Sequence, residues 1–220
     1  MQLDGKLAVI TGGISGLGRA TAERFAKEGA RVVIADINAE KGETAAQEMS
    51  AGGAAIEFIA VNVTDESSQQ ALFDDVVRRY GQLDIVVAAA GISSAGYVSG
   101  EVSTPAEDPE DNFLFNKPIA DWQRVLDVNL TGVAITDRLA ARHMLALGTN
   151  GSIINIASIA GKRPLPGAAD YCVSKAGVIM LTTVFATELA TKNIRVNAIG
   201  PGFIETPMTA SIRQSPEWVQ

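Results

Sequence analysis

Tyr171 and Lys175 stand four residues apart in the run Tyr-Cys-Val-Ser-Lys. On a helix, this spacing stacks the two side chains on one face. A free phenol has a pKa near 10 and is a poor base at neutral pH. An ammonium about 4 Å away, at an effective dielectric constant near 20, favours the phenolate by about 4 kcal/mol, which is roughly three pKa units. The pair therefore predicts a proton-transfer centre; the plain alternative is a surface tyrosine stacked on a lysine.

Ser158 offers a hydroxyl group that can work with this pair. It follows the apolar run Ser152–Ala157, which has the composition of a strand. Ser158 then lies just past the carboxyl end of that strand, at the edge where parallel α/β sheets bind ligands. Its hydroxyl could hold a carbonyl or alcohol oxygen, and its alternative role is that of a cap or turn residue.

A glycine-rich run, Thr11–Gly18, directly follows the first apolar segment and precedes a helical pattern. Gly12 permits a tight turn, Gly16 lets the backbone approach a pyrophosphate, and Gly18 lets a helix pack close to the sheet. The pyrophosphate would meet the N–H groups and the positive dipole end of that helix. Because a strand precedes the glycines and a helix follows them, the run predicts a dinucleotide site.

Asp36 ends the apolar run Arg31–Ala35, 18 residues after Gly18. A carboxylate at this position accepts hydrogen bonds from an adenosine ribose diol and repels a ribose 2′-phosphate. Neither Gly13 nor Ile37 supplies a cation for that phosphate. The sequence therefore favours NAD over NADP, and the structural alternative is an aspartate that ends a strand or caps a helix.

Strand and helix patterns alternate along the chain, and the strands are apolar throughout, as in a sheet covered on both faces. This alternation predicts a single α/β domain over residues 1–220, with a Rossmann-like doubly wound parallel sheet of six strands. The predicted strands are Lys6–Ile10, Arg31–Ala35, Ile56–Val61, Asp84–Ala89, Ser152–Ala157 and Ile194–Ile199, and the first three predicted helices are Gly16–Glu28, Ala39–Met49 and Glu66–Tyr80.

The stretch Gly91–Trp122 departs from this regular alternation, because it is first rich in glycine and serine and then acidic. A loop of this length in a compact domain tends to be functional or disordered. We interpret it either as a solvated surface excursion or as a substrate lid. The cluster Phe113–Phe115 supports a lid, because aromatic rings need a cover.

Composition excludes several classes of protein. The formal net charge is −7 and hydrophobic residues make up 47% of the 220 residues, which indicates a globular domain that does not bind nucleic acid. The longest apolar run, Ile85–Ala90, is far below the roughly 20 residues that span a membrane. The first six residues lack a signal-peptide pattern, so we expect a cytoplasmic protein without a membrane partner. One cysteine, Cys172, and one histidine, His143, argue against a metal site.

Taken together, the motifs resemble those of the short-chain dehydrogenase/reductase family, in its typical single-domain form. The resemblance covers nearly the whole chain, and the interval of 13 residues between Ser158 and Tyr171 is the usual one. It implies that Ser158, Tyr171 and Lys175 are catalytic, and that Asn129 relays protons through water to the lysine. It also implies that the segment Pro201–Thr206 holds the nicotinamide carboxamide.

Some positions depart from the family pattern. The family's Asn-Asn-Ala-Gly motif is Ala88–Gly91 here, and the aspartate expected to contact adenine is Asn62. The usual seventh strand is absent from this chain, so we expect an uncovered sheet edge. The residues predicted to contact the cofactor are Gly12, Ser15, Gly16, Leu17, Gly18, Asp36, Ile37, Asn62, Val63, Ala89, Ala90, Gly91, Tyr171, Lys175, Pro201, Gly202, Ile204 and Thr206.

The resulting hypothesis is an oxidoreductase that interconverts a secondary alcohol and a ketone by hydride transfer with NAD. Ser158 would orient the substrate oxygen, Tyr171 would act as the base, and Lys175 would hold the ribose and lower the Tyr171 pKa. The resemblance implies a homodimer or homotetramer formed through the helices that carry Asn129 and Tyr171. Two alternatives stay open: an NADPH-dependent carbonyl reductase resembling the 3-oxoacyl-carrier-protein reductases, and a non-catalytic nucleotide-binding protein.

Overall fold

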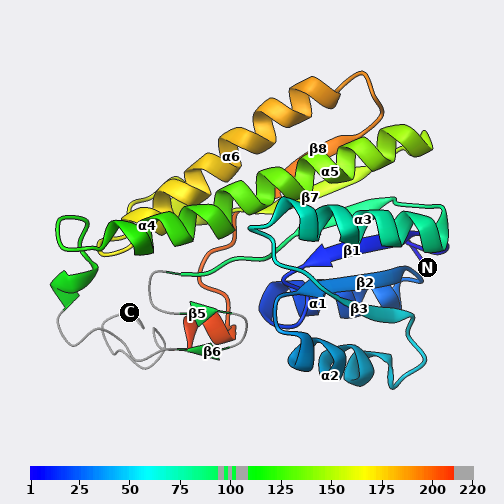
Figure 1. Cartoon of the computed structure of the whole chain (residues 1–220), viewed down its shortest axis with the longest axis horizontal. Helices are drawn as coiled ribbons and strands as arrows, with labels where there is room; N and C mark the ends of the chain where they lie inside the picture. The colour runs from blue at the N-terminus through cyan, green and yellow to red at the C-terminus, as the bar shows by residue number, and fades with distance from the viewer. Residues whose placement is uncertain (94–96, 99–100, 103–108, 211–220) are drawn as a thin grey trace.

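The computed structural model describes residues 1–93, 97–98, 101–102 and 109–210. In this part of the chain, six parallel strands form one sheet with helices on both faces (Figure 1). The strand order is β3-β2-β1-β4-β7-β8. The chain begins in the middle of the sheet, winds outward to β3, returns to β4 and then winds the other way. This is the six-stranded, doubly wound order predicted from the sequence.

Each predicted strand and each of the three predicted helices has boundaries within one residue of the observed ones. The sheet consists of β1 (Leu7–Thr11), β2 (Arg31–Asp36), β3 (Ile56–Ala60), β4 (Ile85–Ala88), β7 (Ser152–Ile156) and β8 (Arg195–Ile199), and a separate short hairpin pairs β5 (Tyr97–Val98) with β6 (Glu101–Val102). The helices are α1 (Gly16–Lys27), α2 (Ala39–Ser50), α3 (Glu66–Tyr80), α4 (Ile119–Leu126), α5 (Gly132–Leu147) and α6 (Ala169–Leu189).

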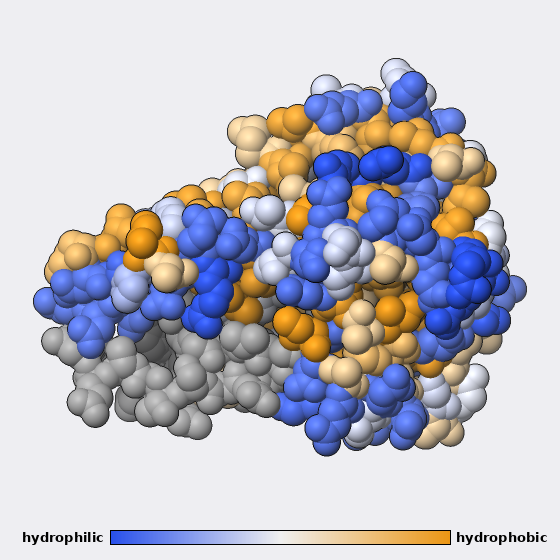
Figure 2. All heavy atoms as spheres, viewed as in Figure 1, coloured by the Kyte–Doolittle hydropathy of each residue, from blue (hydrophilic) through white to orange (hydrophobic). Residues whose placement is uncertain are grey.

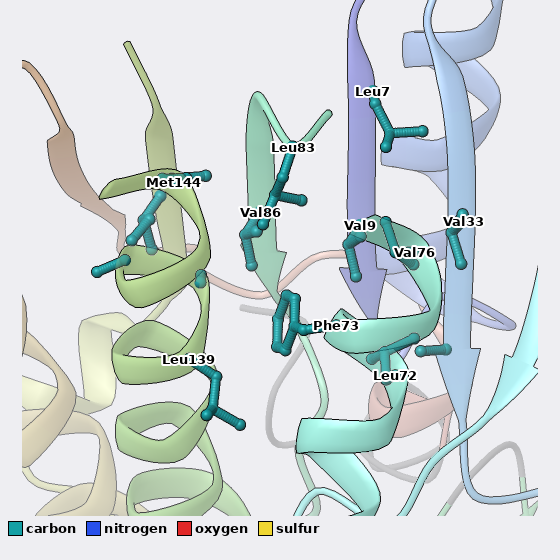
Figure 3. Close-up of a cluster of buried hydrophobic side chains, with 14 of the residues drawn as sticks. Leu7, Val9, Val33, Leu72, Phe73, Val76, Leu83, Val86, Leu139 and Met144 are labelled. Carbon is teal, nitrogen blue, oxygen red and sulfur yellow. The ribbon is translucent and has the colours of Figure 1, made fainter. Parts of the chain in front are cut away.

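Apolar side chains on both faces of the sheet bury it between two helical layers. On one face, α3 and α5 pack Phe73, Leu139 and Met144 against β1, β2 and β4 (Figure 3). On the other face, α1 and α2 pack against a second cluster that includes Ile10 and Ile34. All residues of β1 and β4 are buried, which explains why these strands are apolar rather than alternating.

The edge strand β8 is much less covered than the central strands. Four of its five residues are exposed, and Ile199 is 52% exposed. In the described part of the chain, β8 is therefore an edge strand with little cover.

The segment after β4 differs from its prediction in two ways. The predicted irregular connection extended to Trp122, but α4 already begins at Ile119, after Pro118 at its N-cap position. Aromatic rings were expected to be covered, yet Phe115 is 75% exposed, and its ring meets that of Phe113 in an edge-to-face arrangement. Residues 94–96, 99–100 and 103–108 lie outside the described residues, so the lid hypothesis stays a prediction.

The amide of Asn155 links the sheet to the two helices beside it, and one of its partners is a buried carboxyl group. Asn155 of β7 donates from Nδ2 to Asp137 Oδ2 of α5 at 2.8 Å and to Thr182 Oγ1 of α6 at 3.0 Å. Asp137 is 1% exposed, and burial raises its pKa from the usual 3.8 to about 7, against the lowering effect of the Asn155 hydrogen bond. Asp137 Oδ1 and Asn155 Oδ1 have no partner among the described residues. The environment therefore favours the protonated acid, which carries a donor of its own.

We predict that Asp137 makes stability fall as the pH rises. Because the folded pKa is raised, its stabilising contribution is complete below the usual aspartate pKa and is lost as the pH approaches about 7. Over that range the free energy of unfolding should fall by up to about 1.4 kcal/mol per pH unit from this group. Asp137→Asn, which supplies an amide donor without a charge, should flatten the slope in urea unfolding. The matched variant Asp111→Asn, at an exposed site, should keep it; an unchanged slope in Asp137→Asn would contradict the prediction.

Candidate active site

A cleft opens at the carboxyl ends of β1 and β4, where the winding of the sheet reverses. The turn after β1 needs glycine at Gly12, because its φ is +67° and a Cβ there would lie 2.6 Å from the Ala90 backbone. A Cβ on Gly18 would lie 2.1 Å from the Gly12 carbonyl oxygen. These two glycines therefore let the loop pack against the end of β4 and let α1 pack against the loop.

The loop points the beginning of α1 toward the cleft. Ser15, at the N-cap position, and the first-turn residues Gly16, Leu17 and Gly18 all line the cleft, and no acidic side chain lies in that turn. The amides and the dipole of a 12-residue helix thus face an open space at its positive end. This arrangement is suited to binding a phosphate group.

Asp36 lies at one end of the cleft, at the last position of β2. It is 8% exposed, and its Oδ1 accepts hydrogen bonds from the backbone N–H groups of Ile37 at 2.8 Å and Asn38 at 3.5 Å. The other cleft residues at this end, Asn62 and Val63, carry no positive charge. The Asn62 amide oxygen already accepts two hydrogen bonds from Thr64. A contact with adenine, as predicted for Asn62, would therefore be a third hydrogen bond to the same oxygen.

Ser158, Tyr171 and Lys175 meet at the opposite end of the cleft. Ser158 follows β7 and caps the 3-10 turn Ile159–Gly161 by accepting from Ala160 N at 3.1 Å. Its hydroxyl is also near enough to the Tyr171 phenol to lower the pKa of that phenol. Its two possible roles, cap and oxygen-binding group, are therefore compatible. Lys175 Nζ lies 5.7 Å from the centre of the Tyr171 ring and donates to Ile156 O at 2.8 Å.

The ionisation of this pair differs from the sequence-based expectation. Burial raises the pKa of Tyr171 above its usual value near 10, and the Ser158 hydrogen bond opposes this effect. Burial also lowers the pKa of Lys175 from 10.5 to about 8. In the chain alone, desolvation therefore outweighs the attraction to the ammonium that was expected to lower the tyrosine pKa, because the lysine amine points at a carbonyl oxygen rather than at the phenol.

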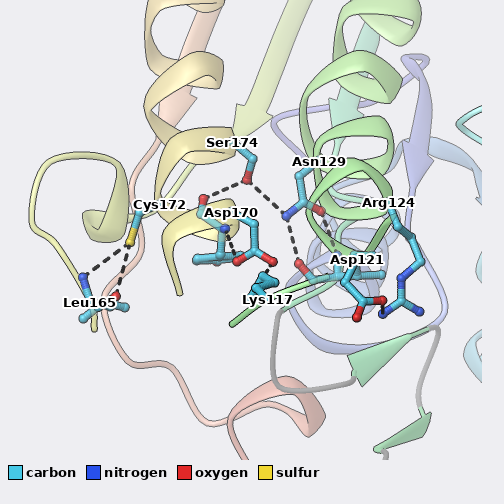
Figure 4. Close-up of polar contacts among 10 residues, drawn as sticks. Lys117, Asp121, Arg124, Asn129, Leu165, Asp170, Cys172 and Ser174 are labelled. Carbon is cyan, nitrogen blue, oxygen red and sulfur yellow. Dashed lines mark hydrogen bonds and ion pairs between the residues drawn. The ribbon is translucent and has the colours of Figure 1, made fainter. Parts of the chain in front are cut away.

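Asn129 is the one predicted site residue that does not line the cleft. It is fully buried in the π-helical turn Asp127–Thr131 between α4 and α5. Its Oδ1 accepts from Ile92 N, its Nδ2 donates to Ile92 O, both at 2.8 Å, and Nδ2 also donates to Ser174 Oγ at 3.3 Å (Figure 4). Asn129 thus fixes the backbone just after β4, where the family's asparagine pair is replaced by alanines.

The remaining wall of the cleft follows β8. Ile159 N donates to Pro201 O, and Thr209 Oγ1 donates to Ile204 O, so this segment is tied both to the turn after Ser158 and to itself. The Thr206 side chain lies 3.6 Å from the position that a Cβ on Gly16 would take, directly across from the glycine loop. All eighteen predicted cofactor residues and Ser158 line the cleft. The sequence motifs did not indicate the other lining residues, which are Val61, Ile92, Val128, Ile156, Ala157, Met208 and Thr209.

Comparison with known proteins agrees with this architecture. The sequence model of the family described as short chain dehydrogenase matches residues 6–217. The 3-oxoacyl-[acyl-carrier-protein] reductase of Thermotoga maritima is 39% identical over 96% of this chain and 79% of its own length. The 3beta-hydroxysteroid dehydrogenase 1 of Eggerthella lenta is 42% identical over 98% of this chain and 77% of its own.

A solved structure has the same fold. The crystal structure of a short-chain type dehydrogenase/reductase from Mycobacterium marinum superimposes with a TM-score of 0.85 at 32% identity, covering 97% of this chain and 78% of that one. The family match and the identity to these relatives extend over nearly the whole chain. The chain therefore belongs to the short-chain dehydrogenase/reductase family of oxidoreductases.

Proposed function

We propose that this chain interconverts a secondary alcohol and a ketone by hydride transfer with NAD. The observation that carries the proposal is the convergence of Ser158, Tyr171 and Lys175 at one end of a cleft whose middle is the beginning of α1 and whose other end is Asp36. One end is built for proton transfer to oxygen, and the rest has the shape and the groups of a dinucleotide site.

The residues of the cleft fit a bound dinucleotide. The glycines keep side chains out of the space before α1, and the first-turn amides of that helix would hold the pyrophosphate. Asp36 would accept from the adenosine ribose hydroxyls, and Thr206 with the Ile204 backbone would hold the nicotinamide amide. When bound, the nicotinamide would supply the hydride acceptor for alcohol oxidation in its oxidised form and the hydride donor for ketone reduction in its reduced form.

The chain's own residues handle the proton. The Ser158 hydroxyl holds the substrate oxygen. The Tyr171 phenolate takes the alcohol proton during oxidation, and the neutral Tyr171 phenol donates a proton to the oxygen during reduction. In the chain alone the Lys175 amine donates to Ile156 O. In the proposed reaction its ammonium form, which is the main form below about pH 8, would stabilise the phenolate. Alcohol oxidation should therefore speed up as Tyr171 ionises and lose this support as Lys175 is deprotonated.

Asn129 supports this centre from behind the cleft. A Cβ on Gly91 would lie 3.3 Å from Asn129 Oδ1 and 3.7 Å from Lys175 Nζ, so both polar atoms flank the same glycine. This proximity supports the proposed water relay from Lys175 past Asn129.

A carbonyl reductase that uses NADPH is the second candidate. The similarity to a protein named 3-oxoacyl-[acyl-carrier-protein] reductase favours reduction of a ketone. The carboxylate of Asp36 opposes a 2′-phosphate at the end of β2. Coenzyme preference therefore separates the two candidates.

We also propose that α6 pairs with a second copy of the chain. Val173, Met180 and Val184 lie on one face of α6 and are 47%, 63% and 46% exposed. Figure 2 shows apolar side chains along the edge of the molecule where α6 lies. By length and composition alone, α6 could also cross a membrane. Only 28% of its most apolar 18-residue stretch is buried inside the protein. Its other face buries Asp170, Ser174 and Lys175, which favours packing within a protein assembly over lipid.

Tyr171→Phe should lower turnover by at least about a thousandfold, because the phenyl ring cannot exchange a proton with the substrate. NADH affinity, followed by fluorescence titration, should stay within about twofold, since Lys175 and the other predicted cofactor contacts are unchanged. Tyr80→Phe, which removes a hydroxyl bonded to Glu57 far from the cleft, is the matched control and should keep full activity. Activity of Tyr171→Phe close to that of the parent chain would refute the assignment.

Asp36→Asn and Asp36→Ala should both improve binding of NADPH relative to NADH, by roughly tenfold, because each removes the charge that repels the 2′-phosphate. The asparagine variant keeps an oxygen that can accept from Ile37 N, so it separates charge from local structure. Titration of each variant with both coenzymes measures the ratio. An unchanged ratio in both variants would make Asp36 a purely structural residue.

Light scattering should give a dimer or a larger assembly for the parent chain. Met180→Glu should shift it toward the monomer, because it places a charge in the centre of the proposed interface. Thr44→Glu adds the same charge to an exposed position of α2, on the opposite face of the sheet, and should leave the mass unchanged. A monomeric parent chain would rule out this interface.

A further inference from the structure

Lys117 and Asp170 form a buried ion pair, and Asp170 directly precedes Tyr171 in the sequence. Lys117 Nζ contacts Asp170 Oδ2 at 2.8 Å, and the two side chains are 5% and 1% exposed. The other ion pairs of the described residues all include at least one side chain that is 17% or more exposed. Burial of both charges removes solvent screening, so this pair acts on its surroundings more strongly than a surface pair does.

Asp170 connects this pair to the backbone of Tyr171. Helix α6 begins at Ala169, and its N-cap residue, Ala168, makes no side-chain capping bond. Asp170 Oδ1 accepts from Tyr171 N at 2.8 Å, which satisfies an amide that the first turn leaves open. The carboxylate therefore replaces the missing cap and fixes the residue that carries the phenol.

Lys117 is itself held in place from the other side. Its backbone N–H donates to Phe113 O at 3.0 Å. The next residue, Pro118, is the N-cap of α4, and α4 packs against α6. Figure 4 shows the Lys117 amine pointing at Asp170, on the side of α6 where Ser174 contacts Asn129. Ser174 Oγ also donates to Tyr171 O at 2.7 Å. Side chains therefore hold both the backbone N–H and the backbone carbonyl of Tyr171.

The charge balance around Tyr171 depends on this pair. Without Lys117, a buried carboxylate would lie one residue from the phenol and oppose its ionisation. Other titratable or charged groups lie on α6 and on the elements around it. They are Cys172, Lys175 and Glu188 from α6, Asp121 and Arg124 from α4, Asp111 from the turn before α4, Asp127 from the π-helical turn, Lys162 and Arg163 after the 3-10 turn, and Arg195 from β8.

We propose that the Lys117–Asp170 ion pair is a positioning device for Tyr171, which fixes the first turn of α6 and neutralises the carboxylate beside the phenol. Both residues are positioning residues, because the described contacts place neither of them in the cleft. The inference rests on the proposed role of Tyr171 as the proton-transfer group. It extends that role to a lysine at the end of the long connection after β4.

The test is a titration of Tyr171 by phenolate absorbance in the whole chain, which needs no substrate. The chain has three tyrosines, so the signal of Tyr171 is obtained by subtracting the curve of Tyr171→Phe in each background. In Lys117→Met, the ionisation of Tyr171 should move to higher pH by about one unit, because the Asp170 charge is no longer balanced. In the double variant Lys117→Met/Asp170→Asn, it should return toward the parent value.

Lys6→Met is the matched control, because Lys6 pairs with the buried Asp84 at the opposite, amino-terminal end of the sheet. It should lower stability without moving the Tyr171 titration. An unmoved titration in Lys117→Met, or a double variant that stays as far shifted as the single one, would overturn the proposal.

Asp170→Asn replaces Lys117→Met if the latter does not fold. It leaves the Lys117 cation unbalanced and should move the ionisation of Tyr171 to lower pH, whereas an unchanged or higher value would overturn the proposal. The result does not depend on the proposed function. If Tyr171→Phe proved fully active, the proposed reaction would fail while the titration would still show whether the ion pair acts on the phenol.

Discussion

The close approach of two backbone segments at the middle of the sheet is the constraint on which the site depends. Gly12 and the Ala89–Ala90 backbone are too near each other to admit any side chain between them. Thr11 strengthens this contact, since its carbonyl oxygen accepts from Ala89 N and its hydroxyl oxygen accepts from Ala90 N. With β1 and β4 joined in this way, α1 must start at the same edge where Ser158 follows β7. Strand pairing thus brings the beginning of α1, which we propose to bind phosphate, to the same cleft as the residues that we propose to transfer the proton.

Desolvation is the second theme of the structure, and it acts in opposite directions on acids and bases. It raises the pKa values of Asp137 and Tyr171 and lowers that of Lys175. The interior thus disfavours every isolated charge near the site, and a charge persists there only with a close partner. Lys117 and Asp170 meet this condition together, at a contact of 2.8 Å between side chains that solvent barely reaches.

Most of the fold and most of the cleft could be predicted from the sequence because glycine turns, apolar strands and short motifs are local signals. Alternation predicted a parallel, doubly wound sheet, and the count of six strands favoured the order found in dinucleotide-binding domains. Three features could not be predicted for physical reasons. The ionisation of Tyr171 depends on burial, which no motif encodes. Asn129 faces Ile92 because of how α4 and α5 join, and this is a tertiary contact. Lys117 is 53 residues from Asp170, so nothing in the local sequence links them.

The connection after β4 is attached to the rest of the protein at both of its ends, and this affects which substitutions it can accept. Its beginning is held by Asn129 at Ile92, and its end is held by Asp170 at Lys117. Both anchors attach to the same frame around the first turns of α6, through Ser174 and Asp170. Replacing the stretch between them leaves these attachment points in place. Evolution or protein engineering could therefore vary this connection as a module and change the surroundings of the proposed reaction centre while its two attachment points stay the same.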